Sequence, residues 1–249
     1  MRVSHLVTVV ATTLLATACT AGFQTGGLVR VAGPPPPAAA VSVHAEIRID
    51  FFGVPLDDAQ DVVFVLDRSG SMSLVSAGFA GQQVGMSETE SALVSLGGTL
   101  ANKAVGKPLP SKLEAAKEEL IDTLRAMPDG TRFDVIFFDD DILMLSPTMM
   151  VLGPDTRADI EGFIRGVRPG GSTAAVPALD LAYQIGAARV VLLSDGLANN
   201  GGDGDELLDR ARGQIARGVR FDTVGIGLDQ DAALLQTLAA ESGGMAVLR

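Results

Sequence analysis

The sequence predicts an α/β domain in which a doubly wound, mostly parallel sheet carries helices on both faces. Three observations predict this fold class. Short, nearly continuous apolar runs, as over 61–66, are typical of strands buried on both faces. Amphipathic stretches of helical period, as over 111–127, alternate with these runs. Serine, threonine and aspartate follow several of the runs, and such sheets bind ligands beyond the carboxyl ends of their strands.

The first 19 residues are typical of a secretory signal peptide, because one early arginine precedes an apolar stretch too short to span a bilayer. The stretch ends in LATAC, which resembles the lipobox of bacterial lipoproteins, although Leu15 stands one residue earlier than usual. We therefore expect export and a lipid anchor at Cys19, on the periplasmic or outer face of a bacterial envelope. The alternative is an ordinary leader in which this cysteine has no role. Cys19 is the only cysteine, so no internal disulfide can form.

A tether is expected over 20–40, because its GPPPPAAA run favours extended polyproline II. The folded domain is expected over 41–249, with its core over 60–248. Apolar and polar residues alternate over 41–50, which predicts a half-buried strand, and the run over 61–66 predicts a fully buried one.

Helices and strands then alternate along the chain. Ser111 and Glu114 have the spacing of a capping box at the start of the helix predicted over 111–127. The strand expected over 132–138 turns through Asp139–Asp141 into a hairpin, whose three acids we expect to form a solvated tip. The remaining expected elements are strands over 188–196, 219–227 and 245–249 and helices over 156–167, 175–186, 205–218 and 231–244.

Three loops at one end of this sheet carry oxygen-bearing side chains. Asp67, Ser69 and Ser71 alternate in the first loop, and Thr173 and Asp195 lie in the other two. Hydroxyl and carboxylate oxygens are the ligands that hard divalent cations prefer. We expect the two aspartates to balance the ion's charge directly or through water, which leaves one coordination position for an outside carboxylate. The alternatives are a polar strand-end turn and, for the threonine, a helix N-cap.

The segments DRSGSMS (67–73), GGSTA (170–174) and LLSDGLANN (192–200) resemble the metal-ion-dependent adhesion site of the von Willebrand factor A domain. The resemblance covers about residues 60–248 and implies a Rossmann-like fold. It also implies that the two serines and the threonine coordinate the ion directly in one state or another, and that the aspartates often act through water. The implied ion is Mg²⁺, with Mn²⁺ or Ca²⁺ as alternatives, and the implied partner is a protein that presents an acidic residue.

Two departures from the family pattern limit what the resemblance implies. Residues 74–110 intervene where the family passes almost directly into its first long helix. Ser87 and Glu90 have capping-box spacing within this insert, so we expect part of it to be helical and to shape the ligand surface. After MAVLR there is no room for the family's final helix, so we expect no piston-like regulation.

Charge and histidine content restrict the function classes. The formal net charge of −11 argues against a nucleic-acid partner. His44 is the only histidine outside the leader and no G-x-S-x-G motif occurs, so we expect no enzyme. The expected function is a metal-dependent protein-binding and adhesion module tethered at the cell envelope. The alternative is a structural or assembly module whose contacts come from 74–110, with the ion serving stability; the sequence does not indicate an oligomeric state.

Overall fold

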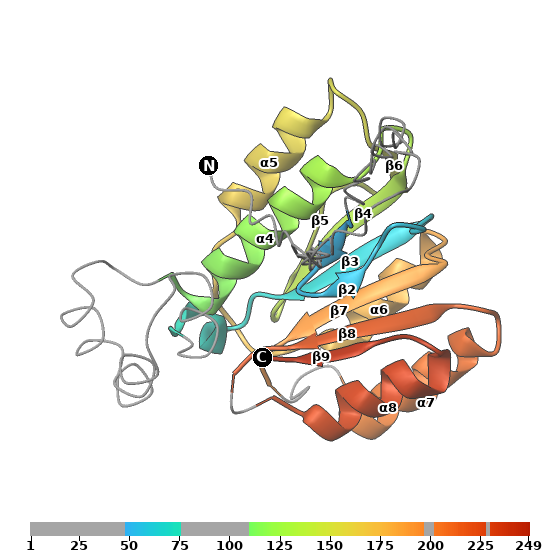
Figure 1. Ribbon diagram of the computed structural model, residues 1–249. Coiled ribbons are helices and arrows are strands. Elements are labelled where there is room, and N and C mark those ends of the chain that lie inside the picture. Colours follow the sequence, from blue (N-terminus) through green and yellow to red (C-terminus); the bar gives the residue numbers. More distant parts are fainter. Residues whose placement is uncertain (1–47, 76–109, 197–201, 228–229) are drawn as a thin grey trace, which may run out of the picture. The chain divides into compact units, whose positions relative to one another are not determined.

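The computed structural model describes residues 48–75, 110–196, 202–227 and 230–249 (Figure 1). The predicted leader over 1–19, the tether over 20–40 and nearly all of the insert lie outside these ranges. Within the described residues, no helix is both long enough and apolar enough to cross a bilayer.

Strands and helices alternate as the sequence predicts. The strands of the central sheet are β3 (Val62–Asp67), β4 (Arg132–Phe138), β5 (Ile142–Met144), β6 (Met150–Val151), β7 (Arg189–Ser194), β8 (Arg220–Gly225) and β9 (Ala246–Leu248). The helices are α4 (Lys112–Ala126), α5 (Arg157–Gly166), α6 (Ala175–Gln184), α7 (Gly204–Ile215) and α8 (Ala232–Ser242), with a 3₁₀ turn, η1, over Gly70–Ser73. The sequence analysis did not predict β6 or η1.

The sheet order is β5-β4-β3-β7-β8-β9, and β6 pairs with β4. Strands β3, β4, β7, β8 and β9 run parallel, whereas β5 and β6 are antiparallel to β4. The fold class and the hairpin after β4 are therefore confirmed. Asp67 lies opposite Phe138, and Leu66 lies opposite Leu193. Because these strands are in register, β3, β4 and β7 end together at one edge of the sheet.

Helices cover both faces of the sheet (Figure 1). Val62, Phe64 and Leu66 of β3 pack in the core beneath α4 and α5. Val63 and Val65 point the other way, into the core formed with α6, α7 and α8. Burial on both faces explains why the apolar run over 62–66 is continuous rather than alternating.

Helix α4 follows its predicted pattern, because Leu113 and Leu120 on its apolar stripe are fully buried. Replacing Leu120 with Ala would lower stability by about 2–5 kcal/mol. Ser111 accepts a hydrogen bond from the Glu114 backbone N–H at 3.2 Å, which is one half of the predicted capping box. The other half does not form, because the Glu114 carboxylate pairs with Lys117 at 2.9 Å.

A small hairpin of β1 (Asp50–Phe51) and β2 (Val54–Pro55) precedes the central sheet. Positive φ angles at Phe52 and Gly53 reverse the chain here. The strand predicted over 41–50 therefore reaches its described end in a separate two-stranded sheet, and residues 41–47 lie outside the described ranges. The hairpin is fastened to α4, where the Thr123 hydroxyl donates to the Asp50 carbonyl at 2.9 Å.

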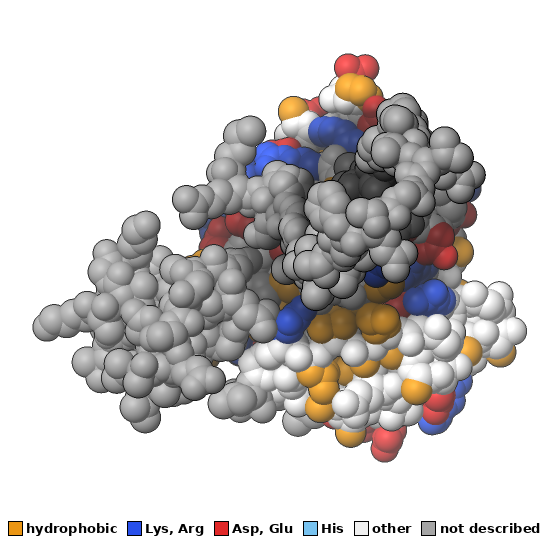
Figure 2. Space-filling view, viewed as in Figure 1, with side chains coloured by type: hydrophobic (Ala, Val, Ile, Leu, Met, Phe, Trp, Pro, Cys, Tyr) orange, Lys and Arg blue, Asp and Glu red, His pale blue; other side chains and the backbone are white. Residues whose placement is uncertain are grey.

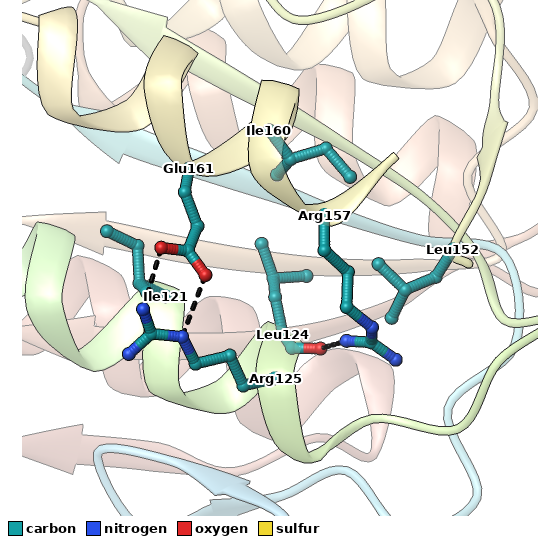
Figure 3. A pocket seen from close by; sticks show the side chains of 7 residues that line it. All are labelled: Ile121, Leu124, Arg125, Leu152, Arg157, Ile160 and Glu161. Atoms are coloured by element: carbon teal, nitrogen blue, oxygen red, sulfur yellow. Dashed lines mark hydrogen bonds and ion pairs between the residues drawn. The ribbon is translucent and has the colours of Figure 1, made fainter. Parts of the chain in front are cut away.

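Charged side chains of both signs are interspersed over α4 and α5 (Figure 2). Arg125 on α4 binds Glu161 on α5 through two hydrogen bonds of 2.7 Å each, and Arg157 donates to the Leu124 carbonyl (Figure 3). These contacts border a shallow crevice lined also by Ile121, Leu124, Leu152 and Ile160, with an accessible volume of about 10 Å³. Because that volume accommodates about one water molecule, the crevice is a packing feature between two helices.

Candidate metal centre

The loops after β3 and β7 meet at the edge where these strands end. Two backbone hydrogen bonds join a third loop to the first: Gly70 N–H donates to the Gly171 carbonyl at 3.1 Å, and Gly170 N–H donates to the Arg68 carbonyl at 2.9 Å. The structure thus brings together the three loops that carry the predicted ligands. We call their shared edge the metal rim, defined by Asp67, Ser69, Ser71, Thr173 and Asp195.

Asp67 lies at the base of the metal rim and is fully buried. Its Oδ1 accepts the Ser69 backbone N–H at 2.8 Å, which closes a tight turn after β3. Its Oδ2 accepts the Ser194 hydroxyl at 2.8 Å. Burial raises the pKa of Asp67, and the nearby carboxylate of Asp195 raises it further, whereas the hydrogen bonds from Ser69 and Ser194 oppose this rise.

A continuous chain of oxygen atoms runs from Ser69 to Asp195. The two serine Oγ atoms lie 3.1 Å apart, and Ser71 Oγ donates to Asp195 Oδ1 at 2.8 Å. Neighbouring ligands in an Mg²⁺ octahedron with bonds of 2.0–2.1 Å lie about 2.9 Å apart, so this spacing fits a small divalent cation. Ser69 and Asp195 are buried, whereas Ser71 is exposed, and the oxygen chain therefore opens to the surface.

Thr173 is 4% exposed and lies two residues after Gly171, in the loop bonded to Gly70. The N-cap of α6 is Ala174, so the threonine is not the cap of that helix. Gly171 has a φ of +63°, and a Cβ there would lie 2.7 Å from Asp140 Oδ2. The loop can therefore approach the β4–β5 hairpin this closely only with glycine at this position.

The expectation of a solvated tip over Asp139–Asp141 is wrong for its first residue. Asp139 is 5% exposed, and its Oδ1 accepts Arg68 Nη2 at 2.6 Å. The same oxygen accepts the Asp141 backbone N–H at 2.8 Å, and the Asp139 carbonyl accepts the N–H of Ala174 at 3.1 Å. Asp139 ends β4 as Asp67 ends β3, so its place after a buried parallel strand was the signal that the sequence analysis missed.

Lys112 is a second residue of the site that the sequence analysis missed. Its ammonium group lies 2.7 Å from Asp195 Oδ2, and both side chains are buried. Ser194 is a third, since it holds Asp67 although no role was assigned to it. Both follow from chain segments meeting in space: Lys112 opens α4 and Ser194 ends β7, far from Asp67 in sequence.

The donor chemistry of the metal rim suits a hard cation, because every side chain in the oxygen chain ends in a hydroxyl or a carboxylate. Among the described residues, no group of three or more His, Cys, Asp or Glu side chains is placed to hold a metal ion. An ion at the rim would therefore depend on the serine and threonine hydroxyls as well as on two carboxylates. Such a shell contributes few negative charges, which leaves a bound ion able to attract an outside carboxylate.

A family model described as von Willebrand factor type A domain matches residues 105–248, which is more than half of the chain. This range includes Thr173 and Asp195 but begins after the loop of Asp67. No curated protein matches the chain.

Solved structures share the fold. A von Willebrand factor type A protein from Catenulispora acidiphila has 18% identity and a TM-score of 0.55 over 77% of this chain, and the match spans 39% of that protein. The conserved hypothetical protein BatB from Bacteroides thetaiotaomicron has 15% identity and a TM-score of 0.52, over 77% of this chain and 90% of its own. An aerotolerance-related membrane protein from Bacteroides fragilis has 18% identity and a TM-score of 0.52, over 77% and 92% respectively.

Proposed function

Because this chain belongs to the von Willebrand factor type A domain family, we propose that it binds a protein partner through a divalent cation held at the metal rim. Domains of this family are metal-dependent adhesion and protein-interaction modules. The proposed ligands are Asp67, Ser69, Ser71, Thr173 and Asp195, and the proposed partner group is a carboxylate.

One observation carries this proposal: the oxygen atoms of Ser69, Ser71 and Asp195 are gathered at contact distances of 3.1 and 2.8 Å at a rim that opens to the surface through Ser71. A bound cation would supply a positive centre that accepts a carboxylate oxygen of the partner. The chain's own residues orient the ligands, because Ser194 and the Ser69 N–H hold the Asp67 carboxylate. Arg68 and Asp139 hold the two neighbouring loops together.

Mg²⁺ is the proposed ion because hydroxyls and a small shell suit its short bonds. Mn²⁺ and Ca²⁺ accept the same oxygen ligands, so their affinities are measured beside that of Mg²⁺. We also propose that the module is not an enzyme and that it works at a bacterial envelope, exported and anchored through an acylated Cys19. The LATAC sequence supports the anchor, and labelling with a radioactive or clickable fatty acid in cells, with Cys19→Ser as the control, tests it.

The binding proposal is tested by capturing partners from envelope extract with the full mature chain, with and without EDTA. Ser71→Ala removes a hydroxyl that faces Asp195, and Ser73→Ala removes one that donates to the Gly70 carbonyl in the same turn. We expect chelation and Ser71→Ala to release the same protein, whereas Ser73→Ala retains it. Capture that survives both EDTA and Ser71→Ala, but is lost on deleting 76–109, would instead favour an assembly module.

A further inference from the structure

We propose that the ammonium group of Lys112 is a built-in counter-ion of the metal rim, which neutralises Asp195 in the absence of a divalent cation and weakens the binding of that cation. This inference rests on the proposed cation site and describes how its affinity is set.

Lys112 occupies an unusual position for a lysine. It is the first residue of α4, where the helix dipole disfavours a positive charge, and its side chain is only 7% exposed. Lysine is almost never buried this far unless its charge is paired. The pairing partner is Asp195, whose side chain is fully buried and whose Oδ2 lies 2.7 Å from the ammonium nitrogen.

The loop after β8 leaves room for this ammonium group by carrying glycine. Gly227 has a φ of +92°, and a Cβ at this position would lie 3.0 Å from Lys112 Nζ and 3.1 Å from Lys112 Cε. Its backbone N–H donates to the Arg249 carbonyl at 2.8 Å, which fixes the loop beside the lysine. Three elements, α4, β7 and the loop after β8, therefore enclose the Lys112–Asp195 pair.

Both oxygens of Asp195 are already engaged. Oδ1 accepts the Ser71 hydroxyl, which belongs to the proposed ligand set, and Oδ2 accepts the ammonium. A cation beside Ser71 would thus share this carboxylate with Lys112. Two positive charges held on one buried carboxylate repel each other, and salt screens this repulsion little because the site is buried.

The same pair protects the domain when the ion is removed. Asp195 without Lys112 would be a buried carboxylate with no counter-charge, which is strongly destabilising. Lys112 therefore has opposite effects on the two states: it stabilises the cation-free domain and lowers the cation affinity. A lysine with a merely structural role would not combine these two effects.

Lys117 offers a matched control on the same helix. Its side chain is 2% exposed and pairs with Glu114, and its ammonium donates to the Arg165 and Val167 carbonyls. It is buried as deeply as Lys112 but has no contact with a residue of the metal rim in these interactions. Lys117→Gln therefore reproduces the loss of a buried charge without changing Asp195.

The test is calorimetric titration of Mg²⁺ into the full mature protein, with Lys112→Gln and Lys117→Gln. Glutamine can still donate a hydrogen bond to Asp195 but carries no charge. We expect Lys112→Gln to bind Mg²⁺ at least about tenfold more tightly than the unmodified protein. We expect Lys117→Gln to leave the affinity unchanged. In EDTA, Lys112→Gln should unfold at a lower temperature, and saturating Mg²⁺ should raise its Tm by more than it raises that of the unmodified protein.

Equal or weaker Mg²⁺ binding by Lys112→Gln, with binding by the unmodified protein intact, would overturn this inference and leave the proposed function standing. Absence of binding in both proteins would overturn both. If Lys112→Gln folds only when Mg²⁺ is added, that rescue supports the counter-ion role, whereas failure to fold at saturating Mg²⁺ overturns it.

Discussion

Arg68 and Asp139 form an ion pair in which Nη2 and Oδ1 lie 2.6 Å apart, with side chains only 12% and 8% exposed. Arg68 lies between Asp67 and Ser69 in the first loop of the metal rim, and the Asp139 carbonyl accepts the N–H of Ala174 in the loop of Thr173. The pair therefore links the end of β4 to two loops that carry proposed ligands.

Asp139→Ala is expected to lower the free energy of unfolding by about 3 kcal/mol, because it leaves the largely buried charge of Arg68 without its partner. It should also weaken Mg²⁺ binding, because the loops lose their common contact. Urea unfolding and Mg²⁺ titration measure the two effects. Glu241→Ala breaks an exposed pair with Arg212 and should change stability by less than about 1 kcal/mol. Equal losses in the two variants would show that Asp139 contributes no more than a surface pair.

Asp134 gives the stability of the domain a pH dependence. It is fully buried in β4, its Oδ1 accepts the Val135 N–H at 2.7 Å, and its Oδ2 has no hydrogen-bond partner among the described residues. Burial raises the pKa of Asp134 from 3.8 to about 7, against the opposing hydrogen bonds. The folded state then keeps a proton that the unfolded chain releases above about pH 4, so stability falls as pH rises from 4 to 7 and levels off above 7.

The size of this Asp134 effect is at most roughly 4 kcal/mol, and Asp134→Asn should remove it because the amide does not ionise. Urea unfolding of both proteins between pH 4 and pH 8 provides the measurement. The stability difference between variant and unmodified protein should grow in favour of asparagine as pH rises. A difference that stays constant across this range would contradict the assignment to Asp134.

Gly171→Ala is expected to lower both stability and Mg²⁺ affinity. The added methyl group would lie 2.7 Å from Asp140 Oδ2 and 2.9 Å from the Asp140 backbone nitrogen, and alanine is strained at a φ of +63°. Gly213→Ala in α7 is the matched control, because a Cβ there would meet no atom within 4 Å. It should raise stability by about 0.5–1 kcal/mol through better helix propensity. Unchanged Mg²⁺ binding by Gly171→Ala would separate this loop from the metal rim.

Tyr183→Phe should stabilise the domain by about 1 kcal/mol. The Tyr183 hydroxyl oxygen is buried without a hydrogen-bond partner among the described residues, while the ring packs edge-on against Phe221 at 6.0 Å. Phenylalanine keeps that packing and removes the unsatisfied hydroxyl. Ser242→Ala should have the opposite sign, because its hydroxyl accepts the Phe221 N–H at 2.9 Å. Thermal unfolding compares the two, and a destabilised phenylalanine variant would show that the hydroxyl has a bound partner.

The regular elements were predictable because their patterns are local. The continuous apolar run over 62–66 indicates a strand covered on both faces, and the stripe with Leu113 and Leu120 indicates a helix with one buried side. The capping box at Ser111 was only half correct, because the Glu114 carboxylate has a competing partner in Lys117. A side chain that can choose between two partners is decided by its surroundings rather than by spacing.

The candidate site was predictable where its residues follow strand ends and was missed where they come from elsewhere. Asp67 and Asp195 directly end or follow parallel neighbouring strands, so their meeting follows from the order of elements. Lys112 stands at the start of a helix, and the sequence analysis read that region only as a capping motif. Asp139 was taken for part of an exposed turn because a run of three acids usually lies in solvent.

The sequence by itself determined the α/β alternation, the two-sided burial of the sheet and the identity of the oxygen-bearing side chains, because periodicity and residue chemistry are properties of the chain. Only the tertiary structure decided which charges meet: Lys112 with Asp195, and Arg68 with Asp139. Pairing of buried charges depends on angstrom-scale distances between segments far apart in the chain, and no local pattern encodes those distances.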